Sequence, residues 1–340
     1  MFIPVIDSDH NPLMPTIPSR ARRMIRSKEA TPFFRKGVFH IRLNREPSNR
    51  KTQPVVVGID PGSKKEAYTV KSEAHTYLNI QANAVIWVKE RMDARRSLRR
   101  KRRNRKTPYR QPRLNRASLK KNRIPPSTKA RWWWKLRICR QLAKMFPISS
   151  FIVENIKARQ KSKRWWDVCF SPLEVGKNWF YTELDRIAPV ETRQGFETKQ
   201  LRDELGLEKL TNKMSENFHT HCVDSWVLAN SLTGGHLIPD NTSVMLLSPI
   251  ALFRRQLHVQ QPVKGGKRRL FGGTRTLGFK RGSLVKHPKY GFVYVGGSKY
   301  NGKLSLHCLH TGERIYVYAK PEDLKFLSWN FWRQNWLKEK

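Results

Sequence analysis

The sequence predicts an α/β fold with two basic additions, an arginine-rich helix and a β-rich C-terminal region. The β-branched run at residues 55–59 is typical of a buried strand, and it ends on Asp60. Nine of the twelve residues from 95 to 106 are Lys or Arg. Three glycine pairs between residues 265 and 297 separate short alternating runs, a pattern typical of a small β-barrel or sandwich.

The first 53 residues predict a small basic module. Short strands are expected near residues 5–6 and 38–43. Residues 11–15 form a turn-rich break before a helix. Ser19 can cap that helix, which is expected to end near residue 28.

The strand at residues 54–60 is expected to pair with hairpin strands at 67–70 and 76–80. Residues 91–105 then predict a helix with almost no apolar face, which is stable only if another molecule surrounds it. A solvated or disordered basic segment is the alternative interpretation. Prolines between residues 108 and 126 indicate an extended basic linker after this helix.

The middle of the chain predicts a helix from about residue 127 to 145, followed by a strand at 151–153 that leads to Glu154. Three consecutive tryptophans, Trp132 to Trp134, begin this helix, and packing is the favoured interpretation over base stacking. The remaining expected elements are helices at 197–206 and 218–230 and strands at 292–295, 304–309 and 315–318.

The charge balance is extreme, with 68 Lys and Arg residues against 26 Asp and Glu, a formal net charge of +42. Nucleic acid is the obvious counter-charge, and phosphate contacts would make its binding strongly salt-dependent. A ribosomal or histone-like protein could be as basic, but 16 Phe and 11 Trp predict folded domains as well. A membrane-surface role is less well supported, because no lipidation motif or basic amphipathic anchor is visible.

The cysteines and the N-terminus indicate the compartment. The four cysteines form no CxxC pair, which argues against a zinc knuckle and against a disulfide framework. The N-terminus lacks a basic n-region, and no apolar run is long enough to span a bilayer. A reducing cytoplasm is the expected setting.

Three acidic residues have settings that suit a metal centre. Asp60 ends the first buried strand, Glu154 closes an apolar run, and Asp224 lies in a predicted helix. Mg²⁺ prefers oxygen ligands, and two ions roughly 3.5–4 Å apart can clamp the attacking and leaving oxygens of a phosphodiester. His221 precedes Asp224 by three residues, so on a helix it shares a face with Asp224 and could handle a proton or steady a water.

Each of these residues has a structural alternative when taken alone. An Asp after a strand is more often a turn or cap residue, Glu154 could be a solvated strand end, and His219 and His221 could be structural. The order of strand-Asp, arginine-rich helix, strand-Glu and His-x-x-Asp helix is much more specific than any one residue.

With these motifs in this order, the chain resembles the IscB/IsrB group of transposon-encoded RNA-guided nucleases over nearly its whole length. Residues 9–15, with Pro12-Leu13-Met14-Pro15, resemble the group's N-terminal PLMP module, and residues 58–63 resemble the first motif of a RuvC nuclease domain. The resemblance implies an RNase H-like core. Residues 95–106 resemble the group's bridge helix, and residues 152–154 resemble the second RuvC motif. Residues 192–195 resemble the approach to the third RuvC motif, and residues 221–226 resemble that motif itself. Residues 272–291 resemble the C-terminal segment.

One departure indicates the branch. IscB relatives insert an HNH nuclease between the second and third RuvC motifs, but here only 70 positions separate Glu154 from Asp224. That interval has no zinc-type cysteine pair and no clear His-Asn-His group, so the chain resembles the IsrB branch. The resemblance implies an endonuclease that nicks the displaced, non-target strand next to a short target-adjacent motif. An unguided structure-selective nuclease and a non-catalytic basic RNA-binding protein are the alternative hypotheses.

The resemblance also implies the site and its partners. Asp60, Glu154 and Asp224 are expected to bind two Mg²⁺ ions, which Mn²⁺ can replace, and His221 is the fourth expected catalytic residue. The expected partners are a structured guide RNA (omega RNA) and target double-stranded DNA, in a monomeric ribonucleoprotein with no membrane partner. The expected nucleic-acid contacts are Arg95, Arg96, Arg99, Arg100, Lys101, Arg102, Arg103, Arg105, Lys264, Lys267, Arg268, Arg269 and Arg275.

Five segments are expected along the chain. They are a PLMP module (1–53), a first RuvC segment (54–90), the bridge helix with its basic linker (91–126), the second and third RuvC segments (127–245), and a C-terminal β-rich region (246–340) that contacts the guide RNA and the target-adjacent motif.

Overall fold

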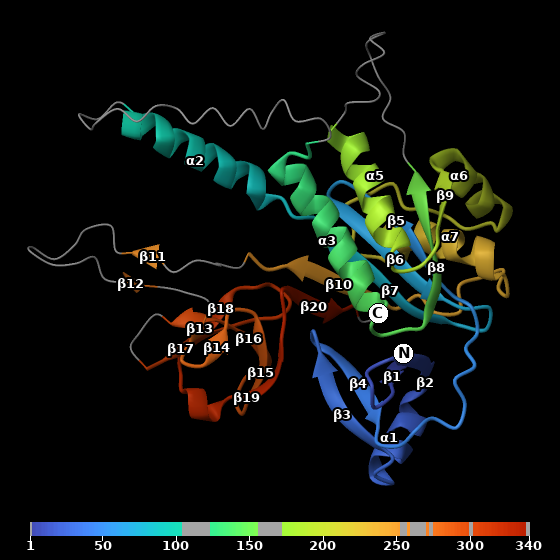
Figure 1. Ribbon diagram of the computed structural model, residues 1–340, viewed down its shortest axis with the longest axis horizontal. Coiled ribbons are helices and arrows are strands. Elements are labelled where there is room, and N and C mark those ends of the chain that lie inside the picture. Colours follow the sequence, from blue (N-terminus) through green and yellow to red (C-terminus); the bar gives the residue numbers. More distant parts are fainter. Residues whose placement is uncertain are drawn as a thin grey trace, which may run out of the picture. The chain divides into compact units, whose positions relative to one another are not determined.

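The computed structural model describes most of the 340-residue chain (Figure 1). The described residues are 2–103, 123–155, 172–251, 257–258, 270–271, 275–298 and 302–337. They divide into one unit of Met1–Lys51, Ile80–Ala82 and Ser243–Lys340 and a second unit of Thr52–Asn79 and Asn83–Thr242. Within these ranges, no helix combines the length and the apolar character needed to cross a membrane.

The second unit is an α/β domain, and it contains the two strands that carry Asp60 and Glu154. Its elements are β5 (Val55–Asp60), β6 (Lys65–Lys71), β7 (Thr76–Asn83), α2 (Trp87–Arg103), α3 (Pro126–Leu142), β8 (Ile148–Asn155), α5 (Pro172–Asp185), β9 (Val190–Gln194), α6 (Gly195–Glu204), the π-helical turn η2 (Phe218–Cys222) and α7 (Val223–Thr233).

The strands of this unit follow the order β7-β6-β5-β8-β9. β5 pairs antiparallel with β6 and parallel with β8, and β8 pairs parallel with β9. Numbered from β5, the order is 3-2-1-4-5 with the second strand antiparallel, which is the arrangement of the RNase H-like fold. The expected α/β class with an RNase H-like core is therefore confirmed.

Helices cover both faces of the sheet, which explains why β5 is apolar without alternation. Successive side chains of a strand point to opposite faces. On β6, Thr69 Oγ1 lies 2.8 Å from Ser225 Oγ of α7, whereas Glu66, three positions earlier, accepts a 2.7 Å bond from Lys135 Nζ of α3. Helices α3 and α7 therefore lie on opposite faces of the sheet, in agreement with Figure 1.

Gly58 allows α7 to approach β5 closely. A Cβ atom at Gly58 would lie 1.9 Å from the carbonyl oxygen of Ser225, a distance that no side chain could tolerate. Val56, Ile152 and Leu228 are buried together at this contact. Because α7 carries Asp224, this close packing positions one side of the candidate site.

The first unit is mostly β-structure. Its sheets have the orders β2-β1-β4-β3 and β18-β17-β16-β15-β19, α1 packs against the first of them, and β10 pairs antiparallel with β20. Its elements are β1 (Ile3–Ile6), β2 (Pro12–Thr16), α1 (Pro18–Arg26), β3 (Ala30–Arg35), β4 (Val38–Leu43), β10 (Val244–Pro249), β11 (Leu257–His258), β12 (Leu270–Phe271), β13 (Arg275–Thr276), β14 (Phe279–Lys280), β15 (Ser283–His287), β16 (Gly291–Ser298), β17 (Leu304–His307), β18 (Arg314–Ala319), η3 (Pro321–Asp323), β19 (Lys325–Trp329) and β20 (Trp332–Trp336).

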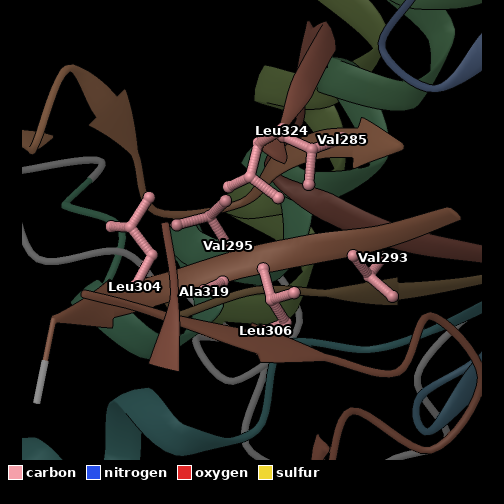
Figure 2. Close-up of a cluster of buried hydrophobic side chains, with 7 residues drawn as sticks. All are labelled: Val285, Val293, Val295, Leu304, Leu306, Ala319 and Leu324. Atoms are coloured by element: carbon pink, nitrogen blue, oxygen red, sulfur yellow. The ribbon is translucent and has the colours of Figure 1, made fainter. Parts of the chain in front are cut away.

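The five-stranded sheet has its own apolar core, which confirms the expected β-rich C-terminal region. Figure 2 shows this core, formed by Val285, Val293, Val295, Leu304, Leu306, Ala319 and Leu324. In the same unit, Lys36 Nζ donates to the carbonyl of Trp329 at 2.9 Å and the Gly37 amide donates to Ser328 Oγ at 2.9 Å. The N-terminal and C-terminal segments of the sequence are thus joined in one unit.

The structure differs from the sequence-based expectation in several elements. The expected turn at residues 11–15 is largely strand β2, which lies at a sheet edge, where proline is tolerated within a strand. The single helix expected at residues 218–230 is divided into η2 and α7. β3, α5, β9 and β10 were not anticipated, because none of them shows a clear hydrophobic period in the sequence.

Candidate active site

Asp60 and Glu154 are neighbours because their strands are parallel and in register. Ile59 pairs with Val153, so the next residues of β5 and β8 end at the same edge of the sheet. Asp60 is 5% exposed and Glu154 is 9% exposed, so both carboxyl groups are largely removed from water. The apolar residues before them thus hold two acidic groups side by side in a buried position.

Burial and neighbouring charge oppose the ionisation of Glu154. Its burial, followed by the charges of Asp60 and Asp224 and a hydrogen bond with Asp60, raises the pKa of Glu154 to about 7. Gly195, the first residue of α6, lies close enough that a Cβ there would stand 3.3 Å from Glu154 Oε1. Glu154 therefore has little room and an excess of negative charge around it, which a bound cation would relieve.

His221 connects Asp60 to a neighbouring loop. Its Nδ1 lies 3.1 Å from Asp60 Oδ2, and its Nε2 lies 3.1 Å from the carbonyl oxygen of Lys213. Both partners are oxygens, so each contact is a hydrogen bond when the ring nitrogen concerned carries a proton. His219, two residues earlier, is turned elsewhere and contacts the carbonyl oxygen of Glu208 through Nδ1 at 3.3 Å.

Asp224 is held by two cations. It lies in the first turn of α7 and is 2% exposed. Arg202 Nη1 donates to its Oδ1 at 2.6 Å, and Lys209 Nζ donates to its Oδ2. Burial acts to lower the pKa of Lys209, but the charges of Asp224 and Asp60 outweigh it and raise the pKa overall. Lys209 therefore lies within electrostatic reach of more than one site carboxylate.

The donor set suits a hard divalent cation. Carboxylate oxygens are the ligands that Mg²⁺ prefers. The carboxylate groups of Asp60, Glu154 and Asp224 lie close enough for their negative charges to repel one another. Over the described ranges, however, no three His, Cys, Asp or Glu side chains are spaced to share one ion as they stand. At Asp224, both carboxylate oxygens instead face cations of the protein.

Sequence reasoning missed three parts of this site. Arg202 and Lys209 contact Asp224 from α6 and from the irregular segment after it, where no periodic pattern points inward. Lys135 of α3 reaches Glu66 at 2.7 Å and the carbonyl oxygen of Gly62 at 3.2 Å, and so braces the turn after Asp60. A lysine within an otherwise buried helical stretch was the available signal for that contact.

The cations of α2 lie on an exposed helix. Arg95, Arg96, Arg99, Arg100 and Lys101 are all exposed, and Arg96 donates to Asp93 at 3.2 Å. Arg102 and Arg103 belong to the same helix, but their side chains, like the whole of Arg105, lie outside the described part. The helix thus presents a dense row of cations to whatever surrounds it.

The other expected nucleic-acid contacts are less informative. Lys264, Lys267, Arg268 and Arg269 lie outside the described residues. Arg275 is exposed at the start of β13, and its Nη1 lies 3.4 Å from the carbonyl oxygen of Gly278.

The tryptophan cluster divides between core and surface. Trp132 and Trp134 are buried, and Trp132 stacks on Phe180 with ring centroids 5.2 Å apart. Trp133 is 39% exposed and stacks on Trp179 with centroids 5.7 Å apart. Packing of α3 against α5 therefore accounts for this cluster.

Comparison with known proteins gives one family match. Residues 3–163 match the family model described as "RRXRR protein". The matched stretch includes Arg99-Arg100-Lys101-Arg102-Arg103, which has the pattern spelled out in that description. No curated protein matches the chain.

Several solved structures share features of the fold. Thermus thermophilus RuvC in complex with a Holliday junction substrate is 13% identical, with a TM-score of 0.29 over 54% of this chain and 98% of that one. The yeast mitochondrial Holliday junction resolvase Ydc2 is 14% identical, with a TM-score of 0.28 over 55% of this chain and 80% of that one. A CRISPR-Cas12f ternary complex is 12% identical, with a TM-score of 0.32 over 62% of this chain and 48% of that one.

Proposed function

We propose that this chain is an RNA-guided DNA endonuclease of the IsrB type that nicks one strand of its target. One observation carries the proposal: Asp60, Glu154, His221 and Asp224 come from separate segments and converge at the ends of β5 and β8. The exposed cations of α2, which lie within the stretch that matches the family model, support binding to nucleic acid.

In this proposal the carboxylates of Asp60, Glu154 and Asp224 would hold two Mg²⁺ ions. When bound, the metal polarises the scissile phosphate and lowers the pKa of the attacking water. Burial and the charges of Asp60 and Asp224 raise the pKa of Glu154, and a bound divalent cation would favour its ionised form. His221, oriented by Asp60 through Nδ1, would position the attacking water, or take its proton on an unprotonated Nε2, once Nε2 leaves the Lys213 carbonyl.

The choice of strand follows from guide pairing. Guide RNA would pair with the target strand and supply sequence specificity, while the protein binds the heteroduplex through its shape and backbone charge. The displaced strand is single and free to enter the site. Between Glu154 and Asp224, the described residues 172–223 are occupied by α5, β9, α6 and η2, which supports a single nuclease centre.

The same proposal implies the partners. A structured guide RNA (omega RNA) serves as part of the scaffold, and target duplex DNA binds beside a short target-adjacent motif. We place the complex in a prokaryotic cytoplasm, associated with the nucleoid, as a monomeric ribonucleoprotein. The charge of +42 favours such a permanent polyanionic partner, because the chain alone would repel itself.

The test begins with the RNA that co-purifies with the chain. Its sequence defines the guide, and the complex is then given a supercoiled plasmid with the matching target and Mg²⁺. We expect an open circle from the native chain and none from Asp60→Ala, Glu154→Ala or Asp224→Ala, each of which should retain its RNA. Cleavage that ignores the guide and follows DNA branching would instead establish the unguided nuclease.

A further inference from the structure

Both oxygens of the Asp224 carboxylate face cations of the protein itself. Arg202 Nη1 bonds Oδ1 at 2.6 Å and Lys209 Nζ bonds Oδ2. The Asp224 side chain is only 3% exposed, so water cannot stabilise its negative charge, and these two contacts do so instead. A carboxylate oxygen has a second lone pair, but a divalent ion placed there would meet the ammonium group at close range.

The two cations differ in how easily they could leave. Arg202 is fixed on α6 and its side chain is 13% exposed. Lys209 lies in the irregular segment between α6 and η2, and its side chain is 28% exposed. A lysine also makes a single-point contact on a flexible stem, whereas arginine has a rigid fork of donors. Lys209 is therefore the cation that can turn away to solvent.

The backbone around Lys209 is held in place. The amide of Leu210 donates to the carbonyl of His219 at 2.9 Å, and His219 Nδ1 contacts the carbonyl of Glu208 at 3.3 Å. Further along the segment, His221 Nε2 lies 3.1 Å from the carbonyl of Lys213. Both neighbours of Lys209 are hydrogen-bonded to His219 of η2. The Lys209 side chain therefore reaches Asp224 from a backbone position that is held in place.

We propose that Lys209 is an internal counter-cation of the metal centre, which neutralises Asp224 in the metal-free chain and must leave for a divalent ion to bind there. The inference rests on the proposed function, since that function supplies the metal. The Lys209–Asp224 contact leaves only a fraction of the molecules with Asp224 available, so the apparent affinity for the metal is reduced by that fraction.

The test measures Mn²⁺ binding directly, by electron paramagnetic resonance of the full-length ribonucleoprotein. Mn²⁺ that still binds to an Asp60→Ala complex belongs to RNA or to the surface and is subtracted. Lys209→Gln should bind Mn²⁺ at the site about tenfold more tightly than the native chain, a change equal to the loss of a ~1.4 kcal/mol competing contact. Lys199→Gln removes the same charge from an exposed position of the neighbouring helix α6 and should leave the affinity unchanged.

Lys209→Arg keeps the positive charge and guards against a variant that fails to fold. It should bind Mn²⁺ no more tightly than the native chain. Site-specific binding that is unchanged or weaker in Lys209→Gln would overturn the role of Lys209 and leave the nuclease proposal standing. Site-specific binding in neither the native chain nor Lys209→Gln would overturn the metal centre itself.

Discussion

At Glu154, burial and the carboxylates of Asp60 and Asp224 act together against a negative charge, and the pKa rises to about 7 from its usual 4.5. In the unfolded chain this group loses its proton near its usual pKa. Between the two values the folded state therefore binds more protons than the unfolded state. The free energy of unfolding then falls as the pH rises through this window, and the loss is complete above about pH 7.

The first prediction follows from this linkage. Without metal, Glu154→Gln should raise the free energy of unfolding at pH 8 by up to about 3 kcal/mol and change it little at pH 4. Urea unfolding in EDTA at the two pH values measures both. Glu183→Gln replaces a partly buried carboxylate that is already paired with Arg140 and Arg186, and it should show no such gain. Equal effects of Glu154→Gln at both pH values would contradict the prediction.

A second residue-scale prediction separates the two histidines. His221→Ala should slow nicking by about 10²–10⁴-fold, the usual contribution of general acid–base catalysis, because it removes the ring bonded to Asp60. His219→Ala should have a much smaller effect, since its ring contacts the Glu208 carbonyl and the neighbouring Phe218 rather than Asp60. Single-turnover nicking rates of the assembled complex decide between them. A normal His221→Ala and an inactive His219→Ala would reverse the assignment.

At the scale of elements, the contact of α7 with β5 determines where Asp224 lies. Gly58→Ala would place a Cβ 1.9 Å from the Ser225 carbonyl and 2.8 Å from the Ala229 amide, so α7 must move. We expect a loss of about 1–3 kcal/mol of stability and a severe loss of nicking. Gly297→Ala is the matched control, because its Cβ would meet nothing within 4 Å. Unchanged stability and full nicking in Gly58→Ala would show that α7 approaches β5 less closely.

The exposed row of cations on α2 gives the second element-scale prediction. Arg99→Ala with Arg100→Ala should weaken binding of guide RNA or heteroduplex and reduce the salt slope of log K by about two units, one for each phosphate contact. Alanine is the best helix former, so α2 itself should persist. Arg140→Ala with Arg186→Ala removes the same charge, but these side chains already bond Glu183, and the slope should hold. An unchanged slope for the α2 variant would favour a solvated helix without a nucleic-acid role.

At the scale of the whole molecule, the prediction concerns the product. A guide-matched supercoiled plasmid should become an open circle, with the break on the strand that is not paired to the guide. Pairing sequesters the target strand in the heteroduplex, whereas the displaced strand can reach the site. Strand-specific end labelling locates the break. A break on the guide-paired strand, or linear product from one complex, would reveal a second centre or a reversed placement of the strands.

Much of the α/β unit could be predicted from local patterns. The apolar runs before Asp60 and Glu154 are long enough to be recognised as buried strands, and both residues lie in strands that the structure contains. α5 and β9 could not be predicted, because their apolar residues follow neither period clearly and their burial depends on partners far away in the sequence. The π-helical turn that carries His221 likewise has no distinct sequence signal.

By itself, the sequence determined the α/β class, the acidic residues at strand ends and the cation-rich helix, since each depends on residue types over a short stretch. Only the tertiary structure decided that Asp60 and Glu154 share an edge, that His221 bonds Asp60 and that Arg202 and Lys209 bond Asp224. These contacts join residues far apart in the chain. Strand register and the packing of α7 at Gly58 set their geometry, and no local pattern encodes either one.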